Sequence, residues 1–117
     1  MGRSLEPTQA PTFSINSKEG FLTKLGLHRK NWKLRWFKLY KNRLAYYASK
    51  DSTTPKNVID LSQAMAVERE FDLNKDFCFR LVTTNRTFYM YAQAECEANE
   101  WVAILRWKLQ HEEPNSP

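Results

Sequence analysis

Glycine, histidine and cysteine are scarce in this 117-residue sequence, and their scarcity excludes several classes of active site. Three glycines are too few to build a glycine-rich phosphate-binding loop. The two histidines and two cysteines show neither metal-ligand nor redox spacing, so we expect no metal site and no cofactor. No Ser/His/Asp or Cys/His arrangement stands out either. The sequence therefore predicts a segment without enzyme activity.

Long apolar runs are also missing. No stretch approaches the ~20 apolar residues needed to cross a bilayer, and no signal-peptide pattern opens the chain. The lone thiols of Cys78 and Cys96 suit a reducing compartment. With 42% apolar and 14% aromatic residues, the chain has room for one globular core and not for two. We therefore expect a single cytoplasmic domain.

Acidic residues are nearly absent from the first half of the foldable chain. Residues 18–50 hold ten Lys and Arg against Glu19 alone, whereas residues 51–117 hold seven against eleven Asp and Glu. A chain polarised in this way should attract anions at one end and repel them at the other. Charge runs are often ordinary solvated strand faces, but here the cations are interleaved with Trp32, Trp36 and Phe37. This interleaving favours a binding site.

The stretch 32–40 alternates as a strand, and one of its faces changes character along its length. That face carries Lys33 and Arg35 and then Phe37 and Leu39. Unpaired charge is costly to bury, so the cationic end must be wet, whereas Phe37 and Leu39 belong in a core. The pattern predicts a strand that begins at a basic rim and continues into the interior.

A strand over 18–25 precedes this one and ends in Lys24, just before the loop. Gly20, Leu22 and Lys24 share one of its faces. An antiparallel hairpin would bring Lys24 to the same edge as Lys33 and Arg35. We call these three residues the basic rim and regard them as the candidate site. The alternative for each is a surface salt bridge, but Glu19 is the only acidic residue nearby in the sequence.

The rest of the sequence predicts a mainly β fold that ends in one helix. Short strands are expected at 18–25, 32–40, 44–47, 57–61, 65–69, 77–83 and 86–92. After Ala92 the period changes, and Ala98, Trp101, Val102, Leu105 and Leu109 recur at helical spacing. Seven strands and a terminal helix indicate a small antiparallel barrel or sandwich, capped by the helix at one end. We expect a domain over 18–110, with a linker or expression-vector residues at 1–17 and a flexible tail at 111–117.

Several motifs, taken in order, resemble a pleckstrin homology (PH) domain. They are Lys18-Glu-Gly-Phe-Leu-Thr-Lys24, Trp32-Lys-Leu-Arg-Trp-Phe37, Leu44-Ala-Tyr-Tyr47, Phe77-Cys-Phe-Arg-Leu-Val-Thr83 and the helix that contains Trp101. The resemblance covers roughly residues 18–110. It is greatest to the members that bind 3-phosphorylated inositides, among adaptor proteins and GTPase regulators.

The resemblance implies a role for each residue of the rim. Lys24 and Arg35 would hold the 3-phosphate side of an inositol headgroup, and Lys33 would add charge. Tyr46 matches a position that donates a hydroxyl to a phosphate, and Arg86 matches a basic contact near the 5-phosphate. The implied ligands are phosphatidylinositol 3,4,5-trisphosphate, the 3,4-bisphosphate, or both, with soluble inositol phosphates as competitors.

The loop between the first two strands would contribute further contacts. His28, Arg29 and Lys30 would reach either the headgroup or the anionic membrane surface, and Leu27 would enter the bilayer or pack within the loop. The sequence departs from tight binders in carrying His28 where several have Arg and Leu27 where Gly is common. The turn at Thr84-Asn85 is also too short to enclose a ligand.

Two other functions compete with lipid binding. The same fold also serves as a protein-interaction module that binds signalling partners or small GTPases, with only weak binding to anionic lipid. Single-stranded nucleic acid would need exposed aromatic residues for stacking, whereas here most aromatic residues share faces with aliphatic ones, so no nucleic acid is expected.

Overall fold

The computed structural model describes residues 17–111, and the expectations for residues 1–16 and 112–117 lie outside this range. Seven strands, one 3-10 turn and one helix follow one another along the chain. The elements are β1 (Ser17–Leu25), β2 (Trp32–Tyr40), β3 (Arg43–Tyr47), β4 (Asn57–Asp60), η1 (Leu61–Gln63), β5 (Ala64–Arg69), β6 (Cys78–Thr83), β7 (Thr87–Tyr91) and α1 (Glu95–Gln110).

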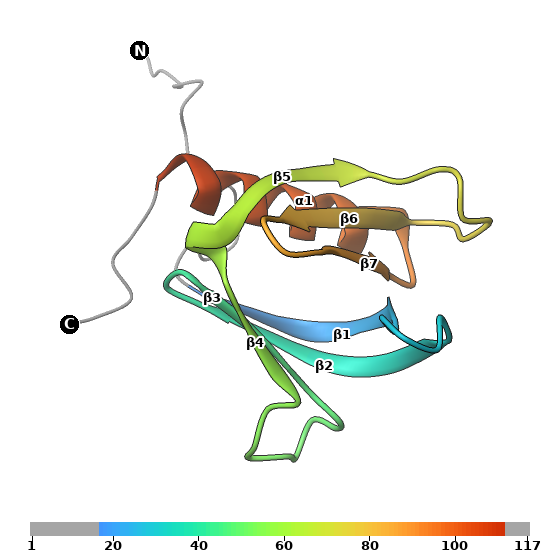
Figure 1. Ribbon diagram of the computed structural model, residues 1–117, viewed down its shortest axis with the longest axis horizontal. Coiled ribbons are helices and arrows are strands. Elements are labelled where there is room, and N and C mark those ends of the chain that lie inside the picture. The colour runs from blue at the N-terminus through green and yellow to red at the C-terminus, as the bar shows by residue number, and fades with distance from the viewer. Residues whose placement is uncertain (1–16, 112–117) are drawn as a thin grey trace, which may run out of the picture.

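The strands form one antiparallel sheet in the order β4-β3-β2-β1-β7-β6-β5. The sheet folds over into two layers, with β1 to β4 in one and β5 to β7 in the other (Figure 1). β1 joins the layers, because it pairs with β2 along its whole length and with β7 only at Thr23 and Lys24. The prediction of a seven-stranded antiparallel fold with one C-terminal helix is confirmed.

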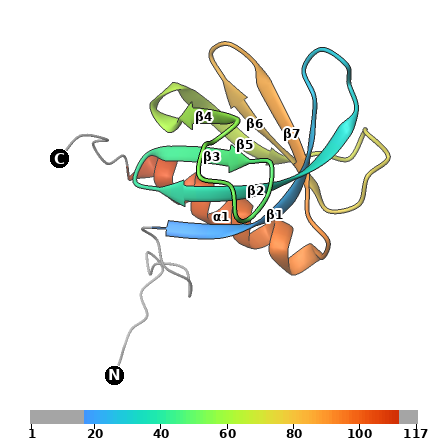
Figure 2. The ribbon, with the colours of Figure 1, turned by 90° about the horizontal axis from the view of Figure 1, so that it is seen from below.

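The helix α1 lies along β5 and contacts both layers of the sheet (Figures 1 and 2). Its Trp101 is 2% exposed and packs edge-on against Phe37 of β2, with ring centroids 6.4 Å apart. Its N-cap residue, Ala94, makes no side-chain capping hydrogen bond, so the start of α1 carries no capping motif in the sequence. The predicted cover over one end of the sheet is therefore present, and Trp101 lies at its centre.

The register of β1 and β2 confirms the predicted faces. Gly20 lies opposite Phe37, Leu22 opposite Arg35, and Lys24 opposite Lys33. Residues directly opposite in an antiparallel pair project to the same side of the sheet. The buried face of this hairpin is therefore continuous with the basic rim, as the alternation in the sequence predicted.

Seven predicted strand boundaries were wrong, each by one residue, and three of them have a clear structural cause. Phe77 precedes β6 and has a φ of 61°, a left-handed conformation that a strand cannot contain. Arg86 precedes β7, since its N–H is bonded to the hydroxyl of Thr83 within the turn. Leu61 begins the 3-10 turn η1, which the Asp60 carboxylate caps by accepting a hydrogen bond from the Ser62 N–H.

Two further observations apply to residues 17–111. No helix there is both long and apolar enough to cross a membrane. No group of three or more His, Cys, Asp or Glu side chains within that range is arranged to hold a metal ion.

Candidate functional site

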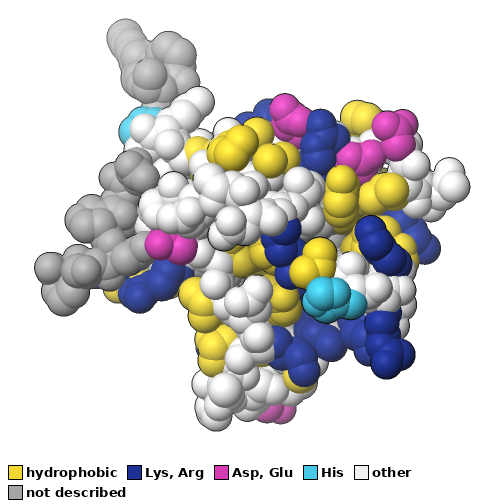
Figure 3. Space-filling model, in the orientation of Figure 1, with side chains coloured by type: hydrophobic (Ala, Val, Ile, Leu, Met, Phe, Trp, Pro, Cys, Tyr) yellow, Lys and Arg dark blue, Asp and Glu magenta, His cyan; other side chains and the backbone are white. Residues whose placement is uncertain are grey.

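The basic rim lies where β1 ends and β2 begins. Lys24 and Lys33 are directly opposite each other in the β1–β2 register, and Arg35 follows two residues further along β2. Lys and Arg side chains gather over this part of the surface, below and to the right in the view of Figure 3. The hairpin therefore brings together Lys24, Lys33 and Arg35, as the sequence predicted.

Lys24 is the most buried cation of the rim, with 9% of its surface exposed. Its ammonium donates to the Leu25 carbonyl at 3.3 Å and lies 4.9 Å from the centre of the Tyr46 ring. Burial, and then repulsion from Arg86 and Arg35, lower the pKa of Lys24 below its ordinary value. An anion at this position would reduce that repulsion.

Arg35 and Lys33 are more accessible than Lys24. One guanidinium nitrogen of Arg35 donates to the carbonyl of its neighbour Leu34 at 3.1 Å, and the side chain is only partly buried. Lys33 is exposed. A guanidinium has five N–H donors in a planar fork, so Arg35 retains donors for an oxyanion while held against its own strand.

Tyr46 of β3 lies inside the same cluster. Its ring is buried and packs against Phe37, with centroids 5.2 Å apart. Its hydroxyl accepts a long hydrogen bond of 3.4 Å from the amide of Asn57 on β4. Because that bond uses an acceptor position, the hydroxyl proton is available to a ligand. Tyr46 is thus a core residue that also presents a hydroxyl.

Arg86 approaches Lys24 from the turn between β6 and β7. Its guanidinium stacks on Phe88 at 4.0 Å, and its Nε–H is buried without a hydrogen-bond acceptor among residues 17–111. A hollow of about 290 Å³ adjoins it, between β4 and the turn. The cationic surface therefore combines residues of β1 and β2 with Arg86 from the turn between β6 and β7, which is distant in the sequence.

The loop between β1 and β2 carries the other predicted contacts. His28, Arg29 and Lys30 are all exposed, and Leu27 is 47% exposed rather than packed within the loop. A hydrogen bond of 2.8 Å from the Gly26 N–H to the Asn31 carbonyl closes the base of the loop. These residues extend the cationic surface outward from the rim.

Salt bridges do not neutralise the rim within residues 17–111. Ion pairs there include those of Lys18 with Glu100, of Arg69 with Glu95, and of Arg80 with Glu68 and Glu70, and none of these involves a residue of the rim. The rim can therefore offer several charged donors to one multiply charged anion, and charge-assisted hydrogen bonds of this kind are strong.

Two features next to the rim were not singled out from the sequence. Asn57 reaches the Tyr46 hydroxyl because β4 lies beside β3, with these two residues opposite each other. Lys75, in the segment between β5 and β6, lies over the rings of Trp32 and Tyr91 at 5.8 and 5.6 Å. Both contacts join segments that are distant in the sequence, so a single sequence does not show that they meet.

Comparison with known proteins identifies the family. The family model described as "PH domain" matches residues 16–110. The human protein named "Dual adapter for phosphotyrosine and 3-phosphotyrosine and 3-phosphoinositide" is 42% identical over 108 residues, which cover 92% of this chain and 39% of that protein. The mouse protein of the same name is 45% identical over 96 residues, covering 82% and 34%. The chain therefore spans well under half the length of these relatives.

Solved structures give the same result. The C-terminal PH domain of pleckstrin in complex with D-myo-Ins(1,2,3,4,5)P5 superposes with a TM-score of 0.68 at 28% identity, covering 77% of this chain and 94% of that one. The N-terminal PH domain of human ARAP2 superposes with a TM-score of 0.71 at 29% identity, covering 93% and 92%. PH domains are non-catalytic modules, so the match indicates no enzyme family. This chain belongs to the PH domain family.

Proposed function

We propose that this PH domain recruits a larger cytoplasmic protein to membranes by binding phosphoinositide headgroups at the basic rim. The observation that carries the proposal is the convergence of Lys24, Arg35 and Arg86, where burial and then repulsion from Arg86 and Arg35 lower the pKa of Lys24. A pleckstrin PH domain of the same fold was solved with an inositol pentakisphosphate. Soluble inositol phosphates should therefore compete with the lipid.

The preferred lipids are those phosphorylated at the 3-position, namely the 3,4,5-trisphosphate, the 3,4-bisphosphate, or both. The names of the human and mouse relatives include 3-phosphoinositide, which supports this choice. Lys24 and Arg35 would bind the 3-phosphate side, with Lys33 adding charge, Tyr46 donating its hydroxyl and Arg86 lying near the 5-phosphate. His28, Arg29 and Lys30 would contact the headgroup or the anionic leaflet, and Leu27 would enter the bilayer.

Co-sedimentation with liposomes tests this proposal. Vesicles that carry each phosphoinositide isomer in turn are compared at physiological salt, for the wild type and for Arg35→Ala. We expect a sharp preference for 3-phosphorylated lipids, which Arg35→Ala abolishes because the bidentate donor is lost. The variant should keep the wild-type thermal midpoint, since within residues 17–111 the Arg35 side chain makes one hydrogen bond, to the carbonyl of its neighbour Leu34.

Arg43→Ala is the matched control, because it removes the same charge near the opposite end of β2. It should leave the lipid preference unchanged. Binding that follows total lipid charge, or that falls equally in both variants, would contradict a specific headgroup site. A protein-interaction module with weak anionic-lipid binding would then be the better explanation.

A further inference from the structure

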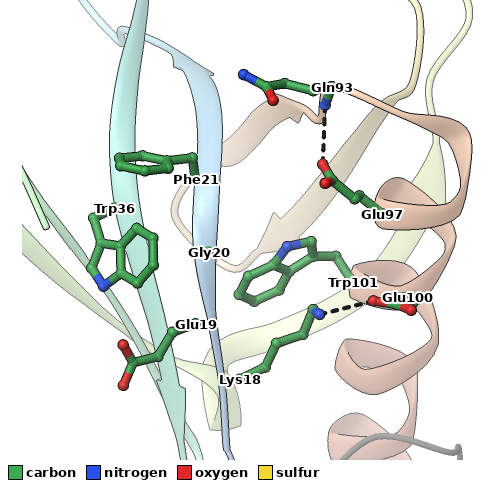
Figure 4. A pocket seen from close by; sticks show the side chains of 9 residues that line it. All are labelled: Lys18, Glu19, Gly20, Phe21, Trp36, Gln93, Glu97, Glu100 and Trp101. Carbon is green, nitrogen blue, oxygen red and sulfur yellow. Dashed lines mark hydrogen bonds and ion pairs between the residues drawn. The ribbon is translucent and has the colours of Figure 1, made fainter.

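A groove separate from the basic rim lies between the first half of β1 and the first half of α1 (Figure 4). Its volume is about 300 Å³. Along β1 it extends from Lys18 to Phe21, so its nearer end is three residues before Lys24, which is roughly 10 Å at the rise of an extended strand. A ligand in this groove would therefore leave the rim accessible.

One side of the groove is an open strand edge. Among residues 17–111, β1 pairs with β7 only at Thr23 and Lys24, so residues 19–21 have a neighbouring strand on the β2 side alone. Backbone groups at such an edge readily accept an additional strand. Gly20 contributes no side chain at this point, and the Trp101 ring bounds the space, since a Cβ there would lie 3.7 Å from it.

The walls of the groove combine aromatic rings with carboxylates. Phe21 is 41% exposed and packs edge-on against Trp36 at 4.7 Å. Glu19 comes from β1 and Glu97 from α1, and neither forms an ion pair within residues 17–111. Aromatic faces and carboxylates together suit ammonium and guanidinium groups.

The chain itself places a cation in part of this groove. The Lys18 ammonium lies 3.1 Å from a carboxylate oxygen of Glu100 and 5.2 Å from the centre of the Trp101 ring (Figure 4). The wall formed by α1 thus accommodates a positive charge between a ring and a carboxylate. The same carboxylates would repel anionic lipid, so the occupant is not a membrane.

We propose that the groove binds an extended, basic peptide segment of a partner protein. The peptide backbone pairs with residues 19–21, and a Lys or Arg side chain reaches the carboxylate of Glu97 on the α1 side of the groove (Figure 4). The inference goes beyond lipid binding and does not depend on it. It gives the domain a peptide site that is available whether or not the rim holds a headgroup.

The first test is an NMR titration of the ¹⁵N-labelled chain with acetyl-Thr-Val-Arg-Val-Arg-Thr-amide. We expect saturable shifts at residues 19–21 and at the Trp101 indole N–H. A peptide with Glu in place of Arg removes the charge, and one with Pro in place of Val removes the ability to form a strand. Neither control should saturate. Equal binding by either control, or shifts only elsewhere in the domain, would overturn the proposal.

Single substitutions provide the second test. Glu97→Gln should weaken the Arg peptide about threefold, as expected for one exposed charge pair. Lys18→Gln should tighten it by about the same factor, because it releases Glu100. Asp51→Asn, on the exposed β3–β4 loop, should leave the affinity unchanged. Weaker binding by Lys18→Gln, or an equal loss in Asp51→Asn and Glu97→Gln, would overturn the proposal.

Discussion

Lys24 combines two properties that rarely coexist, a charge and near-complete burial. Only 9% of the surface of the residue is exposed, and Arg86 and Arg35 repel its ammonium. Its partners in the structure are a backbone carbonyl and the face of Tyr46. Such a buried, repelled charge lowers the stability of the fold when no ligand is bound. Binding sites commonly contain side chains of this kind, because their function requires them.

Lys24→Met should therefore raise stability while it removes binding. Methionine keeps the length of the side chain but has no charge to desolvate, so we expect a gain of about 1 kcal/mol in the free energy of unfolding. Urea denaturation measures this gain, and co-sedimentation with 3-phosphoinositide liposomes measures the loss. A variant that is less stable than the wild type would contradict the assignment of Lys24 as a destabilising binding residue.

The pH dependence of stability provides an independent control. Because folding lowers the pKa of Lys24, the unfolded chain binds more protons in the window just below 10.5, the ordinary lysine value. Wild-type stability should therefore rise with pH across that window, relative to Lys24→Met. A difference between the two proteins that stays constant with pH would contradict the lowered pKa.

At the scale of an element, the β1–β2 loop owes its shape to backbone geometry. Lys30 has a φ of 64°, and the hydrogen bond from Gly26 to Asn31 closes the loop beneath it. A left-handed conformation costs a non-glycine residue roughly 1–2 kcal/mol. The loop thus retains a lysine where glycine would be more favourable, which fits a role for its charge.

Two substitutions at Lys30 separate charge from geometry. Lys30→Gly and Lys30→Ala remove the same charge, so both should weaken binding to anionic vesicles equally, by about 1 kcal/mol. Only glycine adopts the positive φ without strain, so Lys30→Gly should be more stable than Lys30→Ala by about 0.5–1 kcal/mol. Thermal unfolding and vesicle titration measure the two effects. Equal stabilities would show that the loop relaxes to another conformation.

Most elements could be predicted from the sequence because each one has a strong local period. The alternation in 32–40 and the helical spacing around Trp101 both correspond to elements of the structure. The errors occurred where tertiary contacts override local pattern. Phe77 continues the apolar alternation of β6, yet its backbone turns away and its carbonyl accepts a hydrogen bond from Ala92.

At the scale of the molecule, Trp101 connects α1 to the layer formed by β1 to β4. It packs against Phe37 in the core, and its ring faces Gly20 on β1. Trp101→Ala should cost roughly 3–5 kcal/mol of unfolding free energy, as expected for a buried large aromatic side chain. Chemical denaturation monitored by circular dichroism measures the loss.

Trp107 provides the matched control for this prediction. It lies on the same helix but is only partly buried and stacks on His111 with centroids 3.6 Å apart. Trp107→Ala should therefore be clearly less destabilising than Trp101→Ala. Equal losses would mean that Trp101 contributes to helix formation rather than to the contact between helix and sheet.

The sequence alone determined the family, the strands, the capping helix and the cations of the rim. These features are local, since they depend on periodicity and on residues within one hairpin. The tertiary structure decided which distant residues meet that rim. Arg86 approaches Lys24, and Asn57 reaches Tyr46, only because β7 lies beside β1 and β4 beside β3. The open edge of β1 likewise arises where the sheet folds over, because strand pairing is a long-range choice that no single strand encodes.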